Sequence, residues 1–100
     1  MKNIKFSKIN NILQDTKLGK MVVLVDDESR ENEGDLIIPA SKVTARSINF
    51  MAKHGRGLIC LALSQSQVNK LNLPLMSPTN NSRTQTAFTV SIESKKGVTT

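Results

Sequence analysis

Residues 21–38 read MVVLVDDESRENEGDLII, and this stretch decides the fold that the chain is predicted to adopt. It begins with five apolar residues, Met21–Val25, and ends with three, Leu36–Ile38, and each run is typical of a buried strand. Between the runs, positions 26–35 hold six of the chain's eight acidic residues. Carboxylates held between two core strands are fixed in place, which is what a binding site requires.

The acidic window is unusual because the rest of the chain is basic. The chain has 14 Lys and Arg residues and 8 Asp and Glu residues, which gives a formal net charge of +6. The window alone carries about −5, because Arg30 is its only base. Like charges this close repel one another, so we expect a divalent cation, bound through carboxylate oxygens, to compensate them. The alternative is a solvated acidic loop.

Length and composition narrow the class of protein. One hundred residues predict a single domain with a modest core. The basic residues are scattered, and no aromatic pair is placed to stack bases, so we expect no nucleic-acid partner. We expect no membrane association either, because no apolar run approaches the about 18 residues of a span and the N-terminus lacks an apolar signal core. The single cysteine excludes an internal disulfide, and the expected location is cytoplasmic.

Three segments have the capping residues and apolar spacing of helices. The first is expected to begin at a Ser7 cap and to end at Gly19. The second is expected to begin at Ser41 or Thr44 and to close at His54-Gly55, with Gly55 in the left-handed terminal position. The third is expected to be capped by Ser64 and to run through about Leu71.

Four runs have the composition of strands and alternate with these helices. The order predicts an α/β fold, in which a layered mixed β-sheet is flanked by helices. A loop is expected over residues 72–83, which contain two prolines and several Asn and Ser residues. The predicted strands are Met21–Val25, Leu36–Ile38, Gly57–Leu63 and Thr86–Ile92.

The spacing of the carboxylates suggests how they act together. If the acidic segment is extended, Glu31, Glu33 and Asp35 alternate onto one side and converge, while Arg30 faces the other way. Three convergent carboxylates can share a Mg²⁺, bind sugar hydroxyls and supply a general base. Gly34 permits a sharp turn or a close backbone approach among them.

Four blocks of the chain match, in order, the sequence pattern of one known family. They are Asp26–Asp35, His54–Cys60, Thr86–Glu93 and Gly97–Thr100, and the resemblance that they carry extends over nearly the whole chain. With these blocks the chain resembles 3,4-dihydroxy-2-butanone 4-phosphate synthase, a riboflavin-pathway lyase. The resemblance implies that residues 1–100 are the N-terminal part of a single synthase domain, so that its α/β fold is incomplete.

The resemblance also implies a reaction and the residues that carry it. The family converts D-ribulose 5-phosphate to L-3,4-dihydroxy-2-butanone 4-phosphate and formate. Arg30 and Glu31 would contact the sugar phosphate, and Glu31 would also bind Mg²⁺ or Mn²⁺. Asp35 would hold substrate hydroxyls and act in catalysis with Glu33, which would transfer protons.

Two further residues complete the substrate-binding set that the resemblance implies, namely Cys60 and Thr100. From its apolar neighbours alone, Cys60 is interpreted as a buried cysteine rather than a catalytic thiol. His54 matches the family's helix-end histidine, whereas the histidine that completes the metal site belongs to a later part of the family pattern. We therefore expect this chain to be the N-terminal half of a homodimeric enzyme and to have little activity alone. The alternative is a non-catalytic remnant that dimerises or binds sugar phosphates.

Overall fold

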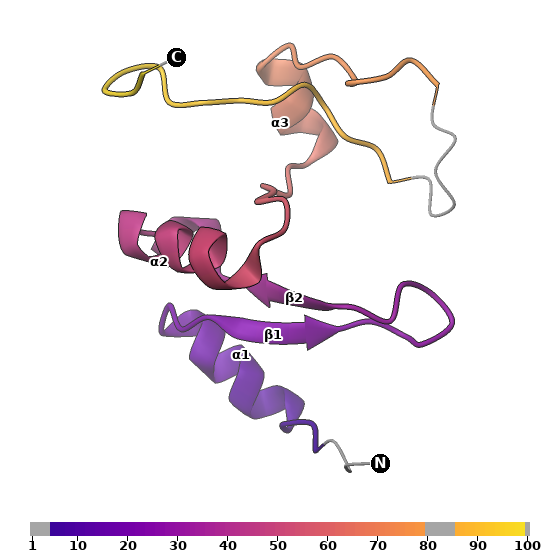
Figure 1. The fold of residues 1–100 in the computed structure, drawn as a ribbon, viewed down its shortest axis with the longest axis vertical. Helices are drawn as coiled ribbons and strands as arrows, with labels where there is room; N and C mark the ends of the chain where they lie inside the picture. The colour runs from indigo at the N-terminus through magenta and orange to yellow at the C-terminus, as the bar shows by residue number, and fades with distance from the viewer. Residues whose placement is uncertain (1–4, 80–85, 100) are drawn as a thin grey trace. The chain divides into compact units, whose positions relative to one another are not determined.

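The computed structural model describes residues 5–79 and 86–99 of the 100-residue chain (Figure 1). The chain divides into two compact units, Met1–Leu61 and Ala62–Thr100. The first unit contains helix α1, the hairpin β1–β2 and the helical turns η1, α2 and η2, and the second contains helix α3. None of the helices in the described ranges is long and apolar enough to span a membrane.

Helix α1, Ile9–Lys17, begins one residue later than its sequence predicts. Lys8 is the N-cap in extended conformation, and no side chain caps the helix, so the Ser7 cap is wrong. The C-terminus agrees with the prediction. Gly19 has φ +79°, and the N–H of Lys20 donates to the carbonyl of Asp15 over 2.9 Å, which satisfies carbonyls of the last turn.

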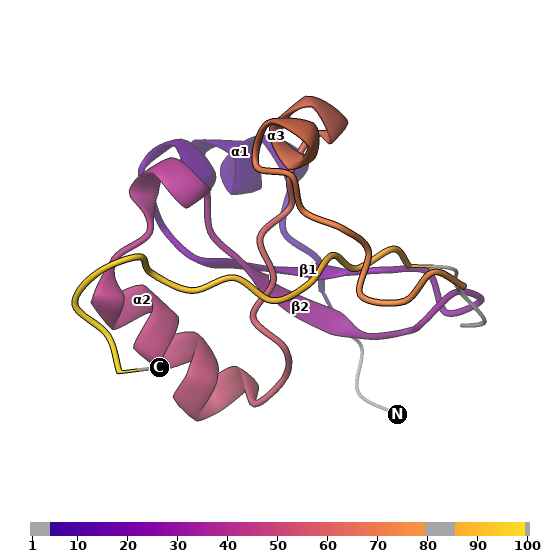
Figure 2. The same cartoon turned by 90° about the horizontal axis from the view of Figure 1, so that it is seen from above.

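The hairpin pairs β1, Val22–Val25, with β2, Gly34–Ile37, in an antiparallel register that runs from Val22 opposite Ile37 to Val25 opposite Gly34. Both apolar runs of the sequence thus form strands, although β2 starts two residues earlier than predicted. It ends before Ile38, which Pro39 follows. Figure 2 shows α1 and α2 on opposite sides of the hairpin, an arrangement of layers that agrees with the predicted α/β class.

Helix α2, Ala45–Phe50, follows the short 3₁₀ turn η1, Ala40–Lys42. Of the two predicted N-caps, the structure selects Thr44, whose hydroxyl accepts from the Ser47 N–H while the Ser47 hydroxyl accepts from the Thr44 N–H. This reciprocal pair satisfies two backbone donors that the first turn would leave open.

The helix continues into a π-helical turn, η2, Met51–Gly55. The left-handed residue that follows is Arg56, with φ +59°, so the prediction that Gly55 takes this conformation is wrong. Gly55 has a different use. A Cβ added there would lie 3.2 Å from Cδ1 of Leu36, so the missing side chain lets η2 approach β2 closely.

The predicted strand Gly57–Leu63 is absent from the sheet. The described residues contain only the two-stranded sheet β1–β2, and no backbone hydrogen bond joins 57–63 to another described residue. A strand is defined by its pairing, and an apolar run without a partner stays unpaired. Apolar composition therefore predicted a strand here that does not pair with any described residue of this structure.

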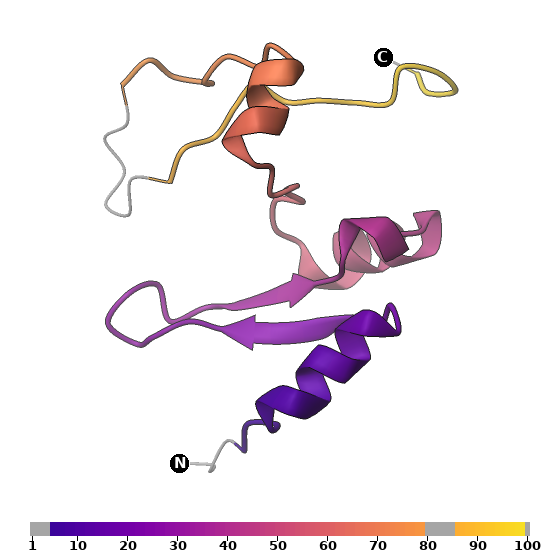
Figure 3. The same cartoon turned by 180° about the vertical axis from the view of Figure 1, so that it is seen from behind.

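In the second unit, α3, Gln65–Lys70, confirms the predicted helix and its cap. Ser64 and Gln67 form a capping box, in which the Ser64 hydroxyl accepts from the Gln67 N–H over 3.2 Å. The predicted strand Thr86–Ile92 is reduced to one antiparallel bridge, Leu75 opposite Thr89. Figure 3 accordingly draws residues 86–92 without a strand arrow. The predicted loop 72–83 is described only as far as residue 79, where it is irregular.

The core of the described chain is small. Val22, 8% exposed, is its one buried apolar side chain. Large apolar side chains of α1, β1, β2 and α2 are exposed, including Leu13 of α1, Leu24 of β1 and Phe50 of α2. Helix capping, turns and the hairpin ladder therefore determine most of the local structure, and one of these turns shapes the site.

Candidate functional site: the loop between β1 and β2

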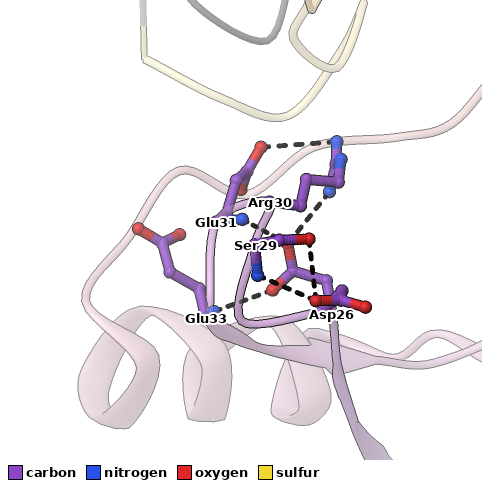
Figure 4. Close-up of polar contacts among 6 residues, drawn as sticks. Asp26, Ser29, Arg30, Glu31 and Glu33 are labelled. Carbon is purple, nitrogen blue, oxygen red and sulfur yellow. Dashed lines mark hydrogen bonds and ion pairs between the residues drawn. The ribbon is translucent and has the colours of Figure 1, made fainter.

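Residues 26–33 of the acidic window form the connection between the two strands, at the end of the hairpin away from α2 (Figure 1). Its organising group is the side chain of Asp26, which follows β1 directly. Oδ1 accepts the N–H of Glu33 over 2.8 Å, and Oδ2 accepts the N–H of Glu31 over 2.8 Å (Figure 4). One carboxylate thereby holds the backbone on the far side of the loop.

A second carboxylate shapes the first half of the loop. Oδ1 of Asp27 accepts both the N–H and the hydroxyl of Ser29, each over 2.8 Å, in the manner of an Asx turn. The carbonyl of Asp27 accepts the N–H groups of Arg30 and Asn32. Asn32 has φ +53°, a left-handed conformation that Asn tolerates better than most residues. The chain therefore reverses direction here instead of remaining extended.

Arg30 lies across the loop and joins two carboxylates. Its Nη1 lies 3.2 Å from Oδ2 of Asp26, and its Nη2 lies 3.3 Å from Oε1 of Glu31. The side chain of Arg30 is 57% exposed, that of Glu31 30% and that of Asp26 20%. Of the two carboxylates that Arg30 contacts, that of Asp26 is thus more covered and that of Glu31 is more exposed.

The same hydrogen bonds determine how the two organising carboxylates titrate. The N–H of Glu33 is the main cause that holds the pKa of Asp26 below its ordinary value of 3.8, and the Glu31 N–H and Arg30 act in the same direction. The N–H of Ser29 is the main cause of a lowered pKa at Asp27. Both carboxylates are therefore ionised at neutral pH, as hydrogen-bond acceptors of this loop must be.

The predicted convergence of Glu31, Glu33 and Asp35 is wrong for this structure. Because the loop turns at Asn32, alternate residues no longer share a side. Figure 4 shows the Glu33 carboxylate directed away from Arg30 and Glu31. Asp35 lies on β2 opposite Leu24. Within the described ranges, no three His, Cys, Asp or Glu residues are grouped so that they could hold a metal ion.

The remaining predicted site residues lie outside the loop. Cys60 is exposed in the unpaired segment after Arg56, so its interpretation as a buried cysteine is wrong. No hydrogen bond among the described residues links it to the loop. Thr100 lies outside the described residues.

Two residues that shape the site were not among the candidates from the sequence. Asp26 was counted only as part of the negative charge, and Asp27 was noted only for having the same parity as the three carboxylates that were predicted to converge. The spacing of Asp27 and Ser29, with Ser two residues after Asp, is a recognisable signal for an Asx turn. The role of Asp26 has no such local signal, because its backbone partners are five and seven residues away.

Comparison with known proteins identifies the family. The family model for 3,4-dihydroxy-2-butanone 4-phosphate synthase matches residues 10–100. The chain belongs to this synthase family. It is 54% identical over 94 residues to the synthase of Photobacterium phosphoreum and 55% identical over 95 residues to that of Pseudomonas syringae pv. tomato. These alignments include 94% and 95% of this chain but 26% of each relative, so the chain spans about a quarter of their length.

A solved synthase structure extends the likeness to the fold. It is a crystal structure of 3,4-dihydroxy-2-butanone 4-phosphate synthase in complex with two magnesium ions. The match has a TM-score of 0.87 at 43% identity and includes 95% of this chain and 44% of the other. The predicted fold class is thereby confirmed: the chain has the fold of part of a synthase.

Proposed function

We propose that this chain carries the acidic substrate and metal loop of a 3,4-dihydroxy-2-butanone 4-phosphate synthase. The reaction would convert D-ribulose 5-phosphate to L-3,4-dihydroxy-2-butanone 4-phosphate and formate. One observation carries the proposal: Arg30 and Glu31 lie 3.3 Å apart, on a loop held by Asp26, in a member of this family. A guanidinium suits phosphate, and a carboxylate suits a hard cation.

The donor chemistry of the loop fits Mg²⁺ or Mn²⁺ in part. Glu31 offers carboxylate oxygens on a partly exposed side chain, and Mg²⁺ is commonly held by one or two protein carboxylates together with waters and substrate phosphate. We therefore propose Glu31 as the ligand that this loop contributes. A bound cation would supply positive charge that stabilises negative charge on the sugar oxygens.

The other side chains of the loop have separate tasks in this proposal. Arg30 would bind and orient the phosphate group, and its planar fork suits a bidentate contact. Asp35 is fixed by the β ladder opposite Leu24 and would accept hydrogen bonds from sugar hydroxyls. Glu33, exposed and directed away from Arg30, would take and return a proton at the sugar. From the family resemblance, Cys60 and Thr100 would each contact the substrate.

The proposal extends to the whole chain. Because the family match runs from residue 10 to residue 100, we assign both compact units to one synthase domain in a cytoplasmic homodimer. The 100 residues alone are expected to release little formate. Their described part groups no three metal-ligating side chains, and an unanchored substrate loses the positioning that lowers a barrier by several kcal/mol.

Formate release from ribulose 5-phosphate tests the proposal. The assay compares the 100-residue chain with a chimera, in which residues 1–100 replace the matching part of the Photobacterium phosphoreum synthase. The chimera should be active. Glu31→Gln should lower its turnover at least about 100-fold, and Asp35→Asn about ten- to 100-fold, typical of a lost hydrogen bond to a charged group.

Glu28→Gln is the matched control, because it removes the same charge from an exposed position in the same loop. It should change turnover by less than about two-fold. Full activity of the 100 residues alone would show that the catalytic groups are misplaced here. A folded but inactive chimera would favour the non-catalytic remnant, and an unaffected Asp35→Asn chimera would remove that residue from the site.

A further inference from the structure

We propose that Arg30 couples cation binding to anion binding by exchanging its partner at Glu31. This inference rests on the proposed function, because it takes Glu31 as a cation ligand. In the structure, the guanidinium that would bind phosphate and the carboxylate that would bind the cation are paired with each other, 3.3 Å apart. Each ligand would therefore compete with a contact that already exists.

One end of this contact is anchored. Oδ2 of Asp26 accepts from Nη1 of Arg30 over 3.2 Å and from the N–H of Glu31 over 2.8 Å. Oδ1 of the same carboxylate accepts from the N–H of Glu33. Because Asp26 is held by two backbone N–H groups, its contact with Arg30 remains in place when the side chain of Glu31 moves.

The other end is open to exchange. The Arg30–Glu31 contact joins two side chains only, and both are partly exposed. A divalent cation on the Glu31 carboxylate would repel the guanidinium and take its place. Arg30 would keep Asp26 and turn the N–H groups of Nη2 toward an incoming anion, which would then lie between two positive groups.

The sign of the coupling follows from this exchange. The cation removes a partner from Arg30 and so favours anion binding, and by linkage the anion must favour cation binding equally. The magnitude is bounded by the strength of the contact that is exchanged. An exposed ion pair of this kind corresponds to about a two- to five-fold change in affinity.

The test is a Mg²⁺ titration of the 100-residue chain, followed by the NMR signal of the Glu31 carboxylate carbon. Arg30→Gln should bind Mg²⁺ about two- to five-fold more tightly than the unaltered chain. Arg30→Lys keeps the charge but lacks the fork, so its affinity should lie between these two. Arg46→Gln removes the same charge from the exposed surface of α2 and should leave the affinity unchanged.

A second arm repeats the titration with inorganic phosphate at matched free Mg²⁺. Phosphate should tighten Mg²⁺ binding in the unaltered chain and in Arg46→Gln but not in Arg30→Gln. Two outcomes would refute the coupling but leave the metal assignment in place, provided that the Glu31 signal responds to Mg²⁺. In the first, Arg30→Gln binds Mg²⁺ no more tightly than the unaltered chain. In the second, phosphate tightens Mg²⁺ binding equally in Arg30→Gln and in the unaltered chain. If Arg30→Lys matches the unaltered chain, charge alone accounts for the effect, and the exchange is again wrong. If Glu31 does not respond in any of the proteins, the metal assignment fails and the coupling fails with it.

Discussion

Asp26 and Glu33 bond to each other in both directions across the loop. The N–H of Glu33 donates to Oδ1 of Asp26 over 2.8 Å, and the N–H of Asp26 donates to the carbonyl of Glu33 over 3.2 Å. The first bond needs a side-chain acceptor, whereas the second continues the backbone ladder of the hairpin. A substitution at Asp26 therefore removes the side-chain bond and leaves the ladder in place.

Asp26→Asn should loosen the loop without unfolding the hairpin. An amide has only one acceptor oxygen, so its NH₂ group would take the place of one carboxylate oxygen and face donors there. In one orientation the NH₂ group would face the Glu33 N–H, and in the other it would face the Glu31 N–H together with Arg30. Hydrogen exchange of the Glu31 and Glu33 amides should become about three- to ten-fold faster, while that of the β1 amides changes little. Glu28→Gln is the control of equal charge. Unchanged exchange at both loop amides would show that Asp26 does not hold them.

The order of the loop should depend on pH in the acid range. Both Asp26 and Asp27 have a pKa below the ordinary 3.8, chiefly because of the N–H groups of Glu33 and Ser29 respectively. For a lowered pKa, the stabilisation is complete above the unfolded value and is lost as the pH falls through the folded value. The carboxylate carbon signals should titrate with midpoints below 3.8, and the Glu33 amide should lose protection over the same range. Midpoints at 3.8 or above would contradict the observed hydrogen bonds.

The start of α2 offers a test between the two caps that were predicted. Thr44→Ala should lower the free energy of unfolding by about 1 kcal/mol, because the Ser47 N–H loses its acceptor. Ser41→Ala, in η1, should change it by less than about 0.5 kcal/mol. Urea unfolding, followed by circular dichroism, measures both. Equal effects of the two substitutions would argue against Thr44 as the cap.

Replacing the left-handed residue after η2 with glycine should stabilise the protein, whereas the same replacement within a helix should destabilise it. Arg56 has φ +59°, which is strained for a residue with a Cβ, so Arg56→Gly should raise the free energy of unfolding by about 0.5 kcal/mol. The same change in the helix, Arg46→Gly, should lower it by about 1 kcal/mol. Chemical denaturation of the two variants compares them directly, and destabilisation by both would place Arg56 in another conformation.

Features that depend on near neighbours were predictable from the sequence. The Ser64 cap, the end of α1 at Gly19 and the two strands beside the acidic window each depend on residues within a few positions. The segment Gly57–Leu63 is as apolar as those strands, but its pairing requires a partner that local composition does not reveal. Left-handed Arg56 was also missed, because the rule that favours Gly at a helix end pointed to its neighbour.

The candidate site was predicted by residue type but not by geometry. Arg30, Glu31 and Glu33 do lie on one loop, as expected. Their arrangement was inferred from the period of an extended strand, which fails when an Asx turn and a left-handed Asn reverse the chain. Asp26 was missed for a related reason: a carboxylate that bonds to the far side of its own loop resembles, in sequence, any other acid.

The π-helical turn η2 also has a consequence for how this family can lose or gain residues. The N–H of Arg56 donates to the carbonyl of Met51, five residues back, so this turn contains one residue more than an α-helical turn does. Deleting one residue from Met51–Gly55 would restore regular winding, because the wide turn holds the additional residue without shifting the phase of the helix by a full residue. The segment that holds Cys60 would then keep nearly its present direction. A one-residue gap is therefore expected to be tolerated here among working relatives, as it is in exposed loops.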